Sequence, residues 1–243
     1  MERKIKVNAD FDALVLEAAE RIVDLSTRTI AAKGAFSMAL SGGHTPEELY
    51  ALLASKPYLP RIDWAKMHVY FGDERCVPPD DKQSNYRMAN NAMLSKVPIP
   101  PAQVHRIRGE IDPQVAAKEY GELLQAQFGE GGLDLILLGM GDDGHTASLF
   151  PGTAALQEKK HRCVANYVEK FKAWRVTMSA PFINKATDVM ILVSGADKAA
   201  RLHEVLEGPR DPERLPIQMI QPVTGTVAWM LDAGAAGMHV DEP

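Results

Sequence analysis

The chain has 243 residues, of which 46% are hydrophobic and 24% are charged, as is typical of a soluble globular protein. A chain of this length is expected to form a single domain over residues 1–243, with room for a small lobe. The formal net charge of −5 leaves no basic surface for nucleic acid, and two cysteines are too few for a disulfide scaffold. No run of about 18 apolar residues occurs, so we expect no membrane partner and a cytoplasmic location.

The hydrophobic pattern predicts helices and strands that alternate along the chain. In chain order we predict a helix over residues 10–33, a strand over 36–40, a helix over 46–54, a strand over 67–71, a helix over 84–95, a strand over 104–107, a helix over 113–128, strands over 133–138, 176–179 and 188–193, a helix over 198–206 and a strand over 226–231. Residues 232–243 are expected to form a loosely held tail. Such alternation is typical of a mostly parallel α/β sheet with helices on both faces.

Four of the predicted strands end in a turn that is polar or rich in glycine. These turns read SGGHTP after residue 40, GDER after residue 71, GMGDDGH after residue 138 and SGADK after residue 193. The carboxyl ends of parallel strands lie at one edge of a sheet, where ligands bind in such folds. We therefore expect the four turns to contribute to one site.

The first of these turns has features of a phosphate site. Ser41, Gly42 and Gly43 precede Thr45, which we expect to cap a helix in a T-x-x-E box that ends at Glu48. Free N–H groups at such a helix start attract a phosphate, and the glycines allow its close approach. A well-capped helix without a ligand is the alternative. The turn is not a P-loop, because the GK[ST] ending is absent.

Three cations lie near other strand ends of the predicted sheet. Arg75 belongs to GDER, Arg175 to WRVT and Lys198 to GADK. Taken singly, such side chains are mostly exposed surface charges, but together they would clamp a phosphate. Asp73, in the same turn as Arg75, could hold that arginine or accept hydrogen bonds from sugar hydroxyls.

The turn over residues 139–145 has two interpretations. Its G-x-G-x-x-G spacing is that of a dinucleotide-binding turn, but Asp142 and Asp143 would place negative charge beside a pyrophosphate. We therefore favour a turn that presents His145 as a general base, oriented by Asp73, Asp142 or Asp143. A structural histidine that caps the next helix is the alternative. No histidine spacing indicates a metal, although Asp142, Asp143 and His145 could form a weak site.

These motifs together resemble a known enzyme family. SGGHTP, GDER followed by SN, GMGDDGHTASLFPG, WRVT and GADK occur in this order across residues 41–198. The chain is thereby similar to the 6-phosphogluconolactonases over nearly its whole length. The resemblance implies a modified doubly wound, Rossmann-like fold, no metal or nucleotide cofactor, and hydrolysis of 6-phosphoglucono-δ-lactone in the oxidative branch of the pentose phosphate pathway.

The related glucosamine-6-phosphate deaminases are the enzymatic alternative. They carry a Gly-His-Ile-Ala-Phe-Asn-Glu pattern whose glutamate takes part in ring opening, whereas Phe150 occupies that place here. They also carry a tyrosine where this chain has Arg75. Both differences favour the lactonase. A non-catalytic sugar-phosphate sensor is a further alternative, but the chain has no room for the helix-turn-helix domain that such regulators carry.

The resemblance also implies roles for the candidate residues. The substrate phosphate would lie against Ser41, Gly42, Gly43 and Thr45, and a second set would grip it: Arg75, Arg175 and Lys198. His145 would activate water, with Asp73 and Asp143 as the catalytic carboxylates. A covalent route through Ser148 is less favoured, because a G-x-S-x-G elbow is absent. The only expected partner is the small-molecule sugar-phosphate lactone, bound by a monomer or a weak homo-oligomer.

Overall fold

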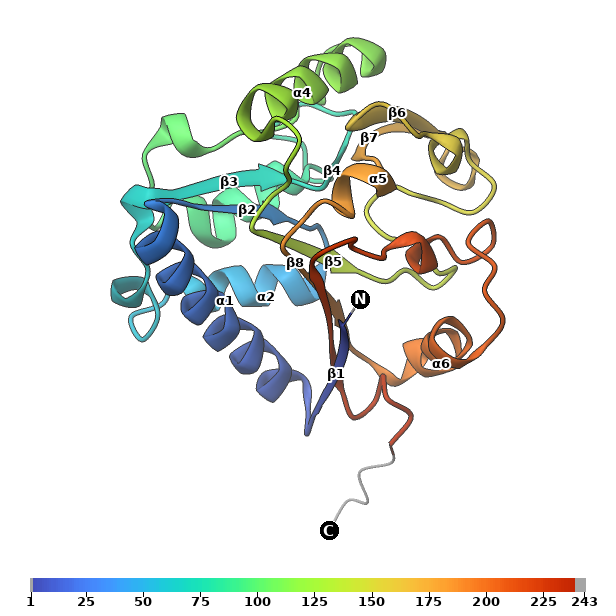
Figure 1. Ribbon diagram of the computed structural model, residues 1–243, viewed down its shortest axis with the longest axis horizontal. Coiled ribbons are helices and arrows are strands. Elements are labelled where there is room, and N and C mark those ends of the chain that lie inside the picture. Colours follow the sequence, from blue (N-terminus) through green and yellow to red (C-terminus); the bar gives the residue numbers. More distant parts are fainter. Residues whose placement is uncertain (1, 239–243) are drawn as a thin grey trace.

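The computed structural model describes residues 2–238 and contains two sheets (Figure 1). The larger sheet is parallel throughout and has the strand order β1-β9-β8-β5-β2-β3. Its strands are β1 (Glu2–Asn8), β2 (Phe36–Leu40), β3 (Met67–Phe71), β5 (Leu135–Gly139), β8 (Asp188–Val193) and β9 (Thr226–Asp232). Strands β5 and β8 lie at its centre and are almost entirely apolar, as expected for strands buried on both faces.

The smaller sheet is antiparallel and has the order β4-β7-β6. Its strands are β4 (Asp73–Arg75), β6 (Cys163–Val168) and β7 (Ala173–Met178). The buried side chains of Cys163, Val176 and Met178 belong to the same hydrophobic core as the larger sheet. The two sheets are thus packed together, and β4 follows β3 after Gly72 alone.

Six α-helices flank the sheets within the described residues. They are α1 (Phe11–Lys33), α2 (His44–Leu53), α3 (Asn85–Ala89), α4 (Pro113–Phe128), α5 (Ala180–Ile183) and α6 (Ala199–Glu207). Figure 1 shows α1 and α2 side by side along the larger sheet, whereas α4 lies against β6 and β7. None of the helices over residues 2–238 is long and apolar enough to cross a membrane.

The predicted α/β class is confirmed, with a mostly parallel central sheet, but three strands were not predicted. Strand β1 alternates charged and apolar residues, and residues 4–7 are all exposed at the sheet edge, so it lacks the pattern of a buried strand. Strand β4 has three residues and was interpreted as a turn. Strand β6 has partners only in β7, so its pairing depends on a hairpin that periodicity does not reveal.

One further prediction about local structure was wrong, and the structure adds detail to two others. Residues 104–107 do not form a strand, because only Val104 bridges β3, directly after a proline-led turn. The predicted helix over 84–95 is confirmed, although its second half is a π-helix over Asn90–Leu94 that continues directly from α3. At the start of the predicted tail, the Asp232 carboxylate accepts hydrogen bonds from the N–H groups of Gly195 (2.9 Å) and Ala235 (2.7 Å). Residues 239–243 lie outside the described residues.

Candidate active site

A cavity of about 300 Å³ lies at the carboxyl ends of the parallel strands. It brings together most of the residues predicted from the sequence: Ser41, Gly42, Gly43, Asp73, Arg75, His145 and Arg175. Asn85, Phe150 and Phe171 complete much of its wall. Thr45, Asp143 and Lys198 are not among the residues that line it.

The glycine-rich turn after β5 is shaped around the His145 ring. The N–H of Gly141 donates to the His145 carbonyl oxygen at 2.9 Å, which closes the turn. A Cβ atom on Gly141 would lie only 2.0 Å from the Nδ1 and Cε1 atoms of that ring. The glycine therefore makes room for the histidine, and the spacing that imitates a dinucleotide-binding turn has a different physical cause.

Of the three carboxylates that could orient His145, Asp143 is the one that contacts it. Its ring Nδ1 lies 2.5 Å from Asp143 Oδ1, and its backbone N–H donates to the same oxygen at 3.1 Å. An Nδ1–H that donates to a carboxylate leaves Nε2 as the free basic nitrogen. Burial alone would raise the pKa of Asp143, but hydrogen bonds from His145 and Lys170 outweigh it and hold that pKa well below its usual value. The pair therefore has the arrangement of a general base and its orienting group.

Phe150 packs directly on the catalytic candidate. Its ring stacks on the His145 ring with centroids 4.0 Å apart and an interplanar angle of 24°. Phe171 meets Phe150 edge-on at 5.6 Å. These contacts fix the ring plane of His145, and they place an apolar side chain where a deaminase would need a carboxylate.

Two arginines lie opposite each other on neighbouring strands of the smaller sheet. Arg75 on β4 and Arg175 on β7 are register partners in the antiparallel ladder. Both have a buried Nε atom without a hydrogen-bond partner among the described residues. Burial, and secondarily the charge of Arg75, lowers the pKa of Arg175. Like charges directly opposite one another are unfavourable, so this pair is suited to an anion that bridges them.

The start of α2 differs from the prediction. The helix begins at His44, with Gly43 as its N-cap at a φ of +108°, and no side chain caps it. The predicted capping box is therefore wrong: Thr45 lies inside the helix, where its hydroxyl bonds Ser194 Oγ at 2.7 Å. The first N–H groups of a helix have no partner within it, so they remain available to an anion beside Ser41 and Gly42.

Gly42 has a second role that the sequence did not indicate. A Cβ atom there would lie 2.2 Å from Oδ1 of Asn85. The Asn85 amide in turn donates to the carbonyl oxygen of Asp73 at 3.0 Å and to its Oδ1 at 3.2 Å. The close approach that requires a glycine is therefore to a side chain of the protein.

Asp73 lines the cavity but is bonded to other groups than His145. Its Oδ2 accepts a 2.6 Å hydrogen bond from the hydroxyl of Ser148, which is fully buried. Its neighbour Glu74 accepts from the backbone N–H groups of Asn85 (2.7 Å) and Tyr86 (2.8 Å) at the start of α3. These two carboxylates thus tie the β4 turn to α3 and to the segment that follows His145.

Lys198 does not line the cavity that contains the two arginines. It ends a short 3-10 helix (Ala196–Lys198), and its Nζ pairs with Asp197 at 3.5 Å. Lys170, which was not predicted, contacts the His145 site instead: its Nζ lies 3.0 Å from Asp143 Oδ2. No sequence signal could reveal this pair, because 27 residues separate its members.

The possible metal cluster is paired internally. The ligand atoms of Asp142, Asp143 and His145 all lie within 4.8 Å of one another. Lys170 bonds both carboxylates, and Asp143 also binds the His145 ring. Every member of the cluster therefore has a protein partner.

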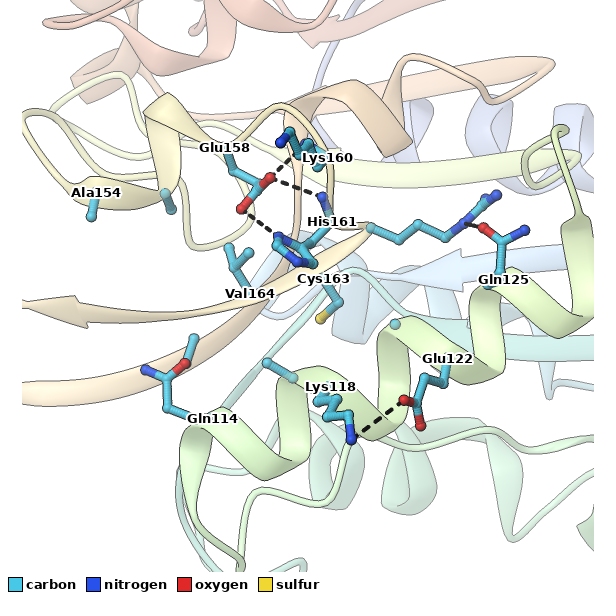
Figure 2. A pocket seen from close by; sticks show the side chains of 15 residues that line it. Gln114, Lys118, Glu122, Gln125, Ala154, Glu158, Lys160, His161, Cys163 and Val164 are labelled. Atoms are coloured by element: carbon cyan, nitrogen blue, oxygen red, sulfur yellow. Dashed lines mark hydrogen bonds and ion pairs between the residues drawn. The ribbon is translucent and has the colours of Figure 1, made fainter.

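A larger cavity of about 710 Å³ lies elsewhere, between α4 and β6 (Figure 2). Its charged side chains are largely paired with one another or with the backbone, as for Lys118 with Glu122 at 3.6 Å. Glu158 accepts three backbone N–H groups and bonds the His161 ring. Since this cavity contains none of the predicted site residues, the smaller one is the better candidate for catalysis.

Comparison with known proteins identifies the family of this chain. Residues 9–229 match the family of glucosamine-6-phosphate isomerases and 6-phosphogluconolactonases. The chain belongs to this family. Within it, a 6-phosphogluconolactonase of Nostoc sp. is 39% identical, over 97% of this chain and 98% of that protein.

Solved structures of family members share the fold. The 6-phosphogluconolactonase from Trypanosoma brucei is 29% identical and superposes with a TM-score of 0.86, covering 97% of this chain and 98% of its own. A monomeric glucosamine-6-phosphate deaminase gives a TM-score of 0.82 at 22% identity, covering 97% of this chain and 100% of its own. That likeness shows the fold alone, so the two activities must be distinguished by site residues.

Proposed function

We propose that this chain hydrolyses 6-phosphoglucono-δ-lactone to 6-phosphogluconate, in the oxidative branch of the pentose phosphate pathway. The observation that carries the proposal is a single cavity with His145, backed by Asp143, in one wall and the Arg75–Arg175 pair in another. The name of the Nostoc relative agrees with it. A sugar phosphate with a reactive carbonyl needs both groups in one site.

The phosphate end of the substrate would bind the two arginines and the start of α2. A dianion between Arg75 and Arg175 removes their mutual repulsion and accepts hydrogen bonds from their guanidinium groups. The Arg175 guanidinium also lies 5.2 Å from the centre of the Phe171 ring, which holds its plane. Binding there fixes the other end of the sugar relative to His145.

The chemical steps follow from the free nitrogen of His145. Nε2 takes a proton from water while the water oxygen forms a bond to C1 of the lactone. The carbonyl oxygen becomes an oxyanion, which reforms the carbonyl as the bond between C1 and the ring oxygen breaks. The imidazolium returns its proton to that ring oxygen, which leaves as the C5 hydroxyl. Asp143 stabilises the imidazolium between these two steps.

A deaminase activity would need a proton-transfer group that this site does not have at residue 150. Ring opening of an amino sugar requires an acid at the place that Phe150 occupies, and the Phe150 ring has no proton to transfer. Ser148 offers no competing covalent route, because it is fully buried and bonded to Asp73. The water-activating histidine therefore has the better support.

The test is a lactonase assay on freshly prepared substrate, corrected for spontaneous hydrolysis. We expect His145→Ala to lower kcat on the order of 10²–10⁴-fold, with KM changed little. Near-normal turnover by this variant would show that His145 is not the base. Ammonia release from glucosamine-6-phosphate by the unmodified protein would favour the deaminase instead.

A further inference from the structure

A lysine lies behind the His145–Asp143 pair. Lys170 belongs to a short 3-10 helix (Glu169–Phe171) at the tip of the β6–β7 hairpin (Figure 1). Its Nζ lies 3.0 Å from Asp143 Oδ2, while Asp143 Oδ1 lies 2.5 Å from His145 Nδ1. The carboxylate is thus shared, one oxygen for each partner. The side chains become more exposed from His145 (23%) through Asp143 (25%) to Lys170 (46%).

This sharing matters because a close carboxylate has two opposite effects on a general base. It orients the ring and stabilises the imidazolium, but the same attraction favours the protonated histidine before the reaction begins. A histidine that is already protonated cannot take a proton from water. A cation on the second carboxylate oxygen offsets part of this attraction without disturbing the first oxygen.

We propose that Lys170 is a positioning residue whose ammonium group offsets the charge of Asp143 and thereby keeps His145 unprotonated near neutral pH. This inference rests on the proposed lactonase function. In support, the hydrogen bonds that Lys170 donates to Asp143, and next to Asp142, raise the pKa of the lysine, so it remains charged across the working range of the enzyme.

Other charged groups surround His145 but do not share its carboxylate partner. Asp142 lies in the same turn as His145, and its backbone carbonyl accepts a hydrogen bond from Arg201 Nε at 2.8 Å. The charged residues that line the cavity or lie near Asp142 are Asp73, Arg75, Arg175, Lys198 and Arg201. A substitution of Lys170 leaves these five side chains in place but also removes the partner of the Asp142 carboxylate, whose Oδ1 lies 3.1 Å from Nζ, so the comparison of variants measures the lysine charge against both carboxylates.

The experiment compares the pH dependence of kcat in Lys170→Met with that of the unmodified enzyme. A unit charge about 6 Å away, largely screened by water, displaces a titration by roughly half a pH unit. We expect the ascending limb of the profile to move to higher pH by about that amount. This corresponds to a roughly threefold lower kcat on the limb, with the plateau and KM within about twofold.

Two further variants show whether the effect belongs to this charge. Lys170→Arg keeps the cation and should restore the unmodified profile. Lys172→Met removes an exposed lysine from the same hairpin and should leave the profile in place. A limb that stays in place in Lys170→Met, or that moves equally in Lys172→Met, would overturn the inference.

A nuclear magnetic resonance titration of the His145 ring tests the inference without catalysis. The ring of Lys170→Met should take up its proton at a pH about half a unit higher than in the unmodified protein. His145→Gln serves to assign the signal. If the unmodified protein lacks lactonase activity, the proposed function fails, whereas an unchanged titration in Lys170→Met would refute the role of the lysine alone.

Discussion

Replacing Gly141 by alanine should disable the catalytic ring while sparing the fold. The added Cβ atom would lie 2.0 Å from two atoms of the His145 ring, whereas carbon atoms in contact are about 3.5–4.0 Å apart. The ring must therefore move by roughly 1.5 Å, which breaks its 2.5 Å contact with Asp143. Since a displacement of about 1 Å can cost on the order of 10²-fold in rate, we expect kcat to fall by at least that factor.

The cost in stability should be small, because the His145 side chain is 23% exposed and can turn toward solvent. We expect the free energy of unfolding to fall by about 1 kcal/mol, at the low end for overpacking. The measurements are steady-state kinetics and urea denaturation. Gly139→Ala is the matched control, because its Cβ would lie 3.9 Å from the nearest backbone atom, outside the strained range. A Gly141→Ala enzyme with unmodified kcat would refute the requirement for this ring position.

Two other substitutions test the binding end and the buried network. Arg175→Ala should raise KM about 10- to 100-fold with a small change in kcat, since a hydrogen bond to a charged group contributes about 1.5–3 kcal/mol. In the absence of an anion, the melting temperature of Arg175→Ala should equal that of the unmodified protein, because the substitution relieves the repulsion from Arg75. A marked fall in melting temperature would contradict the view that the two arginines repel each other. Ser148→Ala should lower the free energy of unfolding by about 1–3 kcal/mol, since Asp73 loses a buried partner, but should keep kcat within tenfold. Loss of turnover in that variant would restore the covalent route.

Much of the larger sheet could be predicted because its buried strands appear in the sequence as short apolar runs. Residues 135–138 and 189–193 are continuous apolar runs, which is how strands covered on both faces read in a sequence. The smaller sheet leaves no such signal. Strand β6 interleaves Asn166 and the exposed Tyr167 with apolar residues, and it contacts β7 and α4, so its own sequence carries little of the signal for its formation.

For the site, the sequence predicted which residues take part better than it predicted which of them contact one another. The turns that contain Gly42, Arg75 and His145 were found because glycines and polar residues directly follow buried strands. The choice of Asp143 over Asp73 as the partner of His145 was open, because it depends on where each carboxylate points. Thr45 shows the same limit: its T-x-x-E pattern fits a cap, but Gly43 can adopt positive φ and starts the helix earlier.

Two arginines of like charge line the same cavity as His145. Arg75 and Arg175, both half-buried, oppose each other on β4 and β7, and each leaves a buried Nε atom without a partner among the described residues. Removing such a pair would cost the fold little, since buried like charges contribute repulsion and desolvation. Local rules are usually broken where a ligand restores the balance, and a phosphate dianion between Arg75 and Arg175 would do so. The same binding would bring the carbonyl of the lactone toward Nε2 of His145, which the Asp143 contact leaves free to meet the attacking water.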